Sequence, residues 1–254
     1  MIPTVRDIYD LIDRIAPFET AEEWDNVGLL AGRYDACAER ALCALELNTA
    51  VLREAIDRRA QLIITHHPIL FSGRKNLRED DAEGRMLCEL VRNHISLIAA
   101  HTNYDIAAGG VNDALASALK LADVEAPEQD MLRIGAPEQC TLGEFADFAQ
   151  NALGAPIRRY GEADRRIHRV ALLGGSGGSY AQMARRCGAD VFLTGEIGHH
   201  AAWSAYEDGM CVLEAGHGAT ELPAISTLAE GLQKAANALQ YKIDIQLSET
   251  ELFR

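Results

Sequence analysis

The pattern that decides the fold is an apolar run ending in two histidines, Leu62-Ile63-Ile64-Thr65-His66-His67-Pro68. A short run of Leu and Ile bounded by polar and turn residues is typical of a strand buried on both faces of a parallel sheet. Two further apolar runs lead to a histidine, over residues 95–100 before His101 and over residues 211–213 before His217. The sequence therefore predicts buried strands whose ends carry imidazole groups.

Strands and helices are predicted to alternate along the chain. The expected strands cover residues 41–47, 61–65, 95–100, 168–173, 191–194, 211–213 and 241–247. Helices are expected between them, an order typical of α/β folds with parallel sheets covered by helices. Residues 59–66, RAQLIITH, also resemble residues 188–195, GADVFLTG. We therefore expect two related α/β halves, each a mainly parallel sheet flanked by helices, with a metal site at strand carboxyl ends between them.

The two halves are expected over residues 1–122 and 165–254. The first contains the His-His and His-x-x-x-Asp motifs, and the second contains the His-x-x-x-Glu motif and the last expected strand. Residues 123–164 have weaker periodicity, apart from one helix that Thr141 and Glu144 would open with a capping box. This segment is expected to connect the halves.

The candidate metal ligands share one spacing. Asp105 lies four residues after His101, and Glu221 lies four residues after His217. Together with His66 and His67 they form a set of imidazoles and carboxylates, which favours Zn, Mn, Fe or Ni held for hydrolytic work over a structural cysteine site. A lone histidine is usually just a hydrogen-bonded residue, but several strand ends with compatible ligands favour a joint site. Two ions about 3.5 to 4 Å apart would use adjacent imidazoles more naturally than one ion would.

Three other patterns leave alternatives open. His199 and His200 could face a substrate or simply begin a helix, and Glu196 before them is the better candidate for supporting a ligand. The glycine-rich run Gly174–Ser179 could hold an anion with its backbone amides or form a tight turn, and it lacks the lysine of a phosphate-binding loop. Residues 24–28, WDNVG, indicate a turn.

Composition narrows the class of protein. The chain has 254 residues, is 48% hydrophobic, and has no apolar run near the roughly 20 residues that span a membrane. Its six cysteines form no CxxC pair, which favours a reducing, cytoplasmic location. A formal net charge of −14 without a dense basic run argues against long nucleic acid as the main partner.

These motifs resemble one family, the dinuclear metal-centre proteins called GTP cyclohydrolase 1 type 2 homologs or Nif-three-like proteins. The matching pieces occur in family order: WDNVGL at residues 24–29, ITHHP at 64–68, HTNYD at 101–105, GGSG at 174–177, TGE at 194–196 and AGHGATE at 215–221. The resemblance covers nearly the whole chain and does not rest on a single motif.

The resemblance implies two divalent ions per chain, held by His66, His67, Asp105, His217 and Glu221, with Glu221 as the bridge. His101 would then line the pocket rather than bind metal. It also implies a toroidal homohexamer with its metal sites facing an internal cavity. The family name further implies a nucleotide-like substrate.

We therefore hypothesise a cytoplasmic hydrolase that acts on a nucleotide-like or other small phosphorylated compound. A metal-bound water would attack the substrate, and His101 or Glu196 would move the proton. The alternative is a non-catalytic, metal- and metabolite-binding regulatory protein, which needs the same ligands. The sequence does not choose between these two, nor among Zn, Fe, Mn and Ni.

Overall fold

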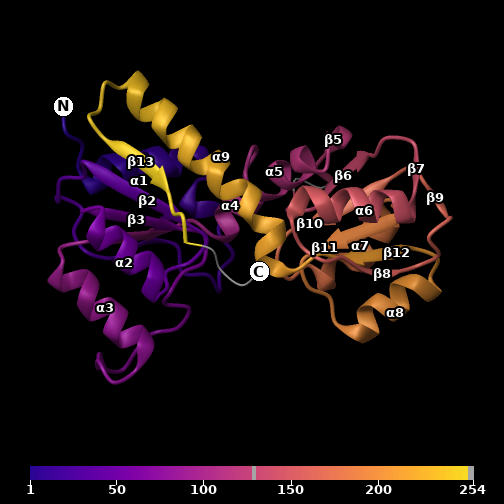
Figure 1. The fold of residues 1–254 in the computed structure, drawn as a ribbon, viewed down its shortest axis with the longest axis horizontal. Helices are drawn as coiled ribbons and strands as arrows, with labels where there is room; N and C mark the ends of the chain where they lie inside the picture. The colour runs from indigo at the N-terminus through magenta and orange to yellow at the C-terminus, as the bar shows by residue number, and fades with distance from the viewer. Residues whose placement is uncertain (128–129, 251–254) are drawn as a thin grey trace. The chain divides into compact units, whose positions relative to one another are not determined.

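The computed structural model describes residues 1–127 and 130–250. The chain divides into two compact units. Unit 1 contains residues 1–107 and 225–254, and unit 2 contains residues 108–224 (Figure 1). Within the described residues, no helix combines the length and apolar character that crossing a bilayer would require.

Unit 1 is built on a five-stranded sheet in the order β1-β4-β3-β2-β13. Its strands are β1 (Gly28–Ala31), β2 (Arg40–Ala44), β3 (Leu62–Thr65), β4 (Ser96–Ala99) and β13 (Asp244–Leu247). Strands β13, β2, β3 and β4 are parallel, and β1 pairs antiparallel with β4. Residues of β2, β3 and β4 are buried almost throughout, as the continuous apolar runs predict.

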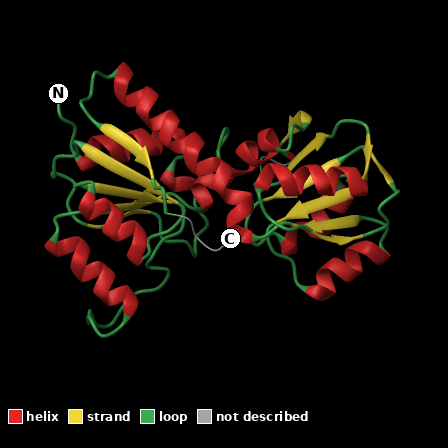
Figure 2. Cartoon of the chain, viewed as in Figure 1, coloured by secondary structure: helices red, strands yellow, loops and turns green. Residues whose placement is uncertain are grey.

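Helices cover both faces of this sheet (Figures 1 and 2). They are α1 (Val5–Ile15), α2 (Thr49–Asp57), α3 (Ala82–Arg92), the short α4 (Thr102–Ile106), the 3-10 turn η1 (Phe18–Thr20) and the later part of α9 (His217–Ala238). One core cluster joins α2 and α3 to the sheet, where Val51 and Leu90 pack with Leu42, Ile63 and Leu97. The α1 and α2 helices begin at side-chain caps, a Thr4–Asp7 capping box and Asn48.

Unit 2 is built on a six-stranded sheet in the order β5-β6-β10-β11-β12-β8. Its strands are β5 (Ala122–Glu125), β6 (Arg133–Ala136), β8 (Arg158–Tyr160), β10 (Val170–Leu173), β11 (Val191–Thr194) and β12 (Cys211–Glu214). The central strands β10, β11 and β12 are parallel, and the outer pairings are antiparallel. A separate two-stranded sheet pairs β7 (Cys140–Thr141) with β9 (Arg166–Ile167).

The larger sheet of unit 2 is accompanied by α5 (Val111–Ala118), α6 (Leu142–Leu153), α7 (Ala181–Arg186), α8 (His199–Glu207) and the first residues of α9. The 3-10 turn η3 (Gly178–Tyr180) precedes α7. Leu115 of α5 and Phe145 of α6 pack with Val170, Val191 and Leu213 in one core. The predicted capping box of Thr141 and Glu144 is present at the start of α6. The sequence thus predicted the α/β class correctly for both units.

Two features of the architecture differ from the sequence-based expectation. The last strand, β13, pairs with β2 in unit 1 and not with the strands of the second half. Residues 123–164, expected to be a connecting segment, supply β6, α6 and β8 to unit 2. The compact units therefore divide at residues 107/108 and 224/225 rather than around 123–164. Strand partners that lie far apart in sequence leave no local pattern, which is why these assignments could not be read from periodicity.

Candidate metal centre

In unit 1, two parallel strands bring three histidines together. Strands β3 and β4 are hydrogen-bonded neighbours, so His66 and His67 after β3 lie beside His101 after β4. The ring centroid of His66 lies 5.1 Å from that of His67 and 5.0 Å from that of His101. One ring nitrogen from each of the three lies within 4.8 Å of the others. The convergence predicted from strand ends is therefore present in this unit.

Asp105 approaches the same group from α4. Its Oδ1 lies 3.7 Å from Nε2 of the buried His66. The turn that precedes α4 is fixed by Asn103, whose Oδ1 accepts a hydrogen bond from the His101 backbone amide at 2.9 Å. The Asn103 side-chain amide in turn donates to the Ala16 carbonyl oxygen at 2.7 Å. The four-residue spacing of His101 and Asp105 thus reflects a short, well-anchored helix.

Asp25 is a further member of this site, and the sequence reasoning missed it by treating its segment as a turn. Its Oδ1 lies 3.0 Å from His101 Nδ1, and its Oδ2 accepts a hydrogen bond from the Thr102 backbone amide at 3.0 Å. Burial acts to raise the pKa of Asp25, but hydrogen bonds from His101 and Thr102 hold it well below its usual range. The ionised carboxylate only accepts, so His101 carries its proton on Nδ1.

His66 is oriented in a similar way by the backbone. Its Nδ1 lies 2.9 Å from the Ala100 carbonyl oxygen, and a carbonyl only accepts hydrogen bonds. Nδ1 therefore carries the proton, and the lone pair is on Nε2, the nitrogen that faces Asp105. His67 has a different neighbour, since its Nδ1 lies 3.5 Å from Glu46 Oε2.

In unit 2, the second pair of candidate ligands lies on one helix. Helix α9 begins at His217 and contains Pro223. His217 and Glu221 therefore share a helical face, with Nε2 of His217 and Oε1 of Glu221 3.2 Å apart. Glu196, after β11, lies on the other side of the imidazole, with Oε2 3.1 Å from His217 Nδ1.

The glycine-rich run Gly174–Ser179 packs against this pair. The amides of Gly174, Gly175 and Gly177 donate to the side chains of Asn112, Thr220 and Thr194 at 2.8 to 3.0 Å. These three amides are therefore engaged within the protein, which favours the tight turn over an anion cradle. Gly175 has a φ of +62°, and a Cβ there would lie 3.2 Å from His217 Nε2 and still closer to Glu221 Oε1. The site needs a glycine at this position.

His199 and His200 are the first two residues of α8, with ring centroids 5.5 Å apart. Within residues 1–127 and 130–250, neither belongs to a group of three candidate metal ligands. Their place at a helix start is one of the two alternatives that the sequence left open. The structure gives them no contact that assigns a substrate-facing role.

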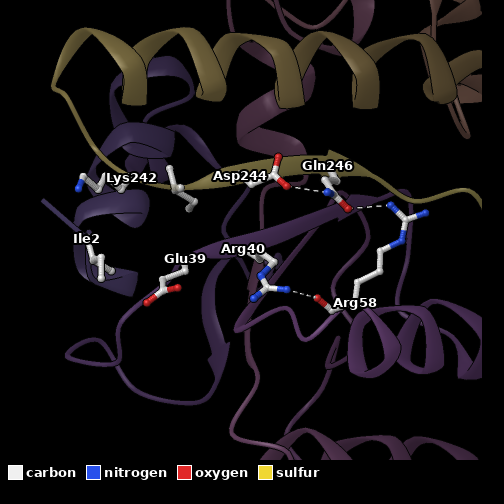
Figure 3. A pocket seen from close by; sticks show the side chains of 8 residues that line it. Ile2, Glu39, Arg40, Arg58, Lys242, Asp244 and Gln246 are labelled. Carbon is white, nitrogen blue, oxygen red and sulfur yellow. Dashed lines mark hydrogen bonds between the residues drawn. The ribbon is translucent and has the colours of Figure 1, made fainter.

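A cavity of about 610 Å³ elsewhere in unit 1 has a different character (Figure 3). Arg40 and Arg58 line it, but Arg40 donates to the Arg58 carbonyl oxygen at 3.1 Å, and Arg58 donates to Gln246 Oε1 at 2.7 Å. The Arg40 guanidinium thus joins β2 to the end of α2, and the Arg58 guanidinium joins that end to the edge strand β13. This cavity therefore lies at the edge of the sheet, and no candidate metal ligand lines it.

The chemistry of the two ligand groups fits divalent metal ions. Imidazole nitrogens and carboxylate oxygens are the ligands of catalytic Zn²⁺ and related ions. In both His66 and His217 an oxygen atom lies within hydrogen-bond distance of Nδ1 and can accept its proton. This arrangement is typical of histidines that bind metal through Nε2. A glycine leaves the space beside Glu221 that a side chain would fill.

Comparison with known proteins agrees with the fold and with these motifs. A curated "GTP cyclohydrolase 1 type 2 homolog" of Clostridium acetobutylicum is 31% identical over 98% of this chain and 96% of its own length. A Staphylococcus aureus hypothetical protein of known structure is 31% identical, with a TM-score of 0.94 over 100% of this chain and 99% of that one. A Bacillus cereus protein related to NIF3 is 25% identical, with a TM-score of 0.95 over 99% and 98%.

The family model described as Duf34/NIF3 (NGG1p interacting factor 3) matches residues 3–252. This match spans almost the whole chain, and it includes every candidate ligand described above. The family expected from the sequence motifs is confirmed. The chain belongs to the Duf34/NIF3 family.

Proposed function

We propose that this protein is a metal-dependent hydrolase that binds two divalent ions through His66, His67, Asp105, His217 and Glu221. The observation that carries the proposal is the orientation of its imidazoles. His66 and His217 each direct Nδ1 at an oxygen acceptor and Nε2 at a carboxylate. This arrangement is typical of histidines that serve as metal ligands in hydrolytic sites.

Two divalent ions, when bound, would supply Lewis acidity and make a water molecule more acidic. The chain's own residues would move the proton. Asp25 holds the Nδ1–H of His101, which leaves Nε2 to take a proton from water and later return it. We assign His101 as the catalytic base. Glu196 holds Nδ1 of His217 and acts as a positioning residue, although its exposed carboxylate is also a candidate for proton transfer.

The proposed substrate is a nucleotide-like or other small phosphorylated compound. The name of the curated relatives, "GTP cyclohydrolase 1 type 2 homolog", supports this class. We further propose a cytoplasmic homohexamer, on the basis of the sequence resemblance. Light scattering would report a mass near six chains, and a stable monomer would refute the assembly.

Metal content tests the first part of the proposal. Protein stripped with chelator and dialysed against Zn²⁺ or Mn²⁺ should contain close to two ions per chain by mass spectrometry of the metal. Glu221→Gln removes the carboxylate charge that offsets repulsion between cations, so at least one ion should be lost while far-UV circular dichroism stays the same. A stoichiometry near zero for the parent protein after metal addition would refute the metal centre.

Turnover tests the second part. Metal-loaded protein would be incubated with a panel of nucleotides and phosphorylated metabolites, and products read by mass spectrometry. His101→Ala should keep its metals and lose turnover by about 10²- to 10⁴-fold, the usual effect of a missing general base. His168→Ala, at an exposed histidine of unit 2, is the matched control and should keep turnover.

Two outcomes would change the assignment. Loss of metal from His101→Ala would make His101 a ligand. Its position fits that outcome, because one of its ring nitrogens lies within 4.8 Å of ring nitrogens of His66 and His67. Absence of turnover across the panel, together with metabolite binding that depends on the ions, would favour the regulatory alternative.

A further inference from the structure

Two large aromatic side chains of unit 1 are exposed beside His101. Trp24 is 60% exposed and Phe71 is 53% exposed. Their rings are nearly parallel, with an interplanar angle of 12° and centroids 6.5 Å apart. Two large aromatic side chains exposed together next to a polar site are typical of a binding surface.

The spacing of the two rings is close to that of a sandwich. A flat ring inserted between two others needs roughly 7 Å, twice the separation of about 3.5 Å at which carbon atoms attract best. The centroid distance of 6.5 Å is the upper limit of the separation between the two ring planes, so the rings would have to move apart by at least about half an ångström. Both side chains are exposed, so a small side-chain rotation would supply the difference.

Hydrogen bonds anchor the segments that carry the two rings. Asp25, next to Trp24, is bonded to His101 and Thr102. The side-chain amide of Asn26 donates to the carbonyl oxygen of Leu70, next to Phe71. The backbone on both sides is therefore held in place before any ligand arrives, which reduces the entropy cost of binding.

The orientation of the rings relates them to the proposed base. The imidazole of His101 is edge-on to both, at 6.1 Å and 78° from Trp24 and at 5.5 Å and 90° from Phe71. A flat ring parallel to Trp24 and Phe71 would thus stand at about a right angle to His101.

A cavity of about 770 Å³ continues from Phe71, a volume typical of small-molecule sites. Its lining includes Ser72, Lys75 and Asn76, which offer hydrogen-bond donors and a positive charge. Arg74 lines it as well but is paired with Asp81 at 2.7 Å. The cavity suits the polar part of a ligand whose flat part lies against the rings.

We propose that Trp24 and Phe71 form an aromatic clamp that sandwiches a planar heterocycle of the nucleobase type. This inference rests on the proposed function for the role of His101, and it defines the substrate class more closely. Base–aromatic stacking tolerates different bases, so the clamp selects flat heterocycles over sugar phosphates without a base.

The test uses Trp24 as its own reporter. The chain has two tryptophans, so Trp203→Phe leaves Trp24 as the only indole. GMP titrated into this variant should quench its fluorescence, and ribose 5-phosphate should not. Phe71→Leu should weaken GMP binding by about 5- to 150-fold, the range for one lost stacking contact, and leave any ribose 5-phosphate affinity unchanged. Phe71→Tyr should restore GMP binding.

The matched control is Leu239→Ala, at an exposed apolar residue of unit 1 outside the lining of this cavity. It should leave GMP affinity unchanged. The clamp is overturned if GMP fails to quench, or if Phe71→Leu weakens GMP and ribose 5-phosphate equally. It is also overturned if Phe71→Leu lowers the mass of the protein in light scattering, because the rings would then be covered by a second copy.

A second titration, in chelator, separates this inference from the proposed hydrolase. The rings need no metal, so quenching by GMP should survive removal of the ions. If the parent protein shows no turnover or no metal binding but GMP still quenches its fluorescence, the hydrolase is refuted and the clamp stands. Intact metal-dependent turnover without quenching would do the reverse.

Discussion

Gly175→Ala provides a test of how tightly unit 2 constrains its ligand pair. The backbone there is left-handed, with φ at +62°, and the new Cβ would lie 3.2 Å from His217 Nε2 and closer still to Glu221 Oε1. The left-handed conformation costs a non-glycine residue about 1–2 kcal/mol. Relief of the contact would move the Glu221 carboxylate by roughly 1 Å. Metal–ligand distances tolerate only about 0.2 Å, so metal binding should respond more than stability.

Two measurements on metal-free protein separate these effects. The melting temperature should fall by about 2–8 °C, as expected for 1–2 kcal/mol in a chain of this size. Calorimetric titration with Zn²⁺ or Mn²⁺ should show affinity weakened by about 10- to 100-fold, the usual effect of disturbing a ligand's surroundings.

Gly154→Ala is the matched control. Gly154 has a similar φ of +65°, but a Cβ there would have no heavy atom within 4 Å. It should lower the melting temperature by a similar amount and leave metal affinity unchanged. Equal metal affinities for the two variants would refute the assignment of Gly175 and Glu221 to a metal centre.

Three further predictions concern unit 1. Burial acts to raise the pKa of Glu54, but hydrogen bonds from residues 248–250 and the charge of Arg58 bring this pKa below its ordinary value. The Glu54 carboxylate therefore stabilises the fold at pH values above the ordinary pKa, and this stabilisation is lost as the pH falls through the lowered pKa. Glu54→Gln should therefore cost about 1–3 kcal/mol in urea unfolding at pH 7 and less at pH 3, and a cost independent of pH would contradict this account. Burial raises the pKa of Cys43 to about 12. Iodoacetamide at pH 8 should therefore modify the exposed Cys37 and spare Cys43, which peptide mass spectrometry would measure. Equal labelling of the two cysteines would contradict this prediction. Asn48→Ala removes the cap of α2 and should cost about 1 kcal/mol in thermal unfolding, whereas Asn48→Asp should keep most of the stability; equal losses would exclude a capping role.

The central strands could be predicted from sequence because burial on both faces gives a continuous apolar run. The strands β3 and β11 lie within one residue of their predicted bounds. The edge strand β5 was missed, since all four of its residues are exposed and carry no apolar pattern. The five-residue α4 was missed because one turn of helix is too short for periodicity to appear.

The candidate site could be predicted where its residues follow buried strands. His66, His67 and His101 are brought together by neighbouring strand ends, as expected. Asp25 could not be found in this way, because it lies 76 residues from His101 and its partner is chosen by tertiary structure. Its only signal in the sequence was its place in the WDNVGL motif of the family resemblance.

The division of the chain into a continuous and a discontinuous unit has a consequence for its synthesis. Unit 2 is complete once residue 224 has been made, whereas unit 1 still lacks residues 225–254. During that interval β2 has no neighbour on the side that β13 will occupy. An open strand edge is a template for pairing with other chains, so this is the stage at which nascent chains are most exposed to aggregation. Strand β13, which follows unit 2 in the chain, is thus the one that covers this edge of β2.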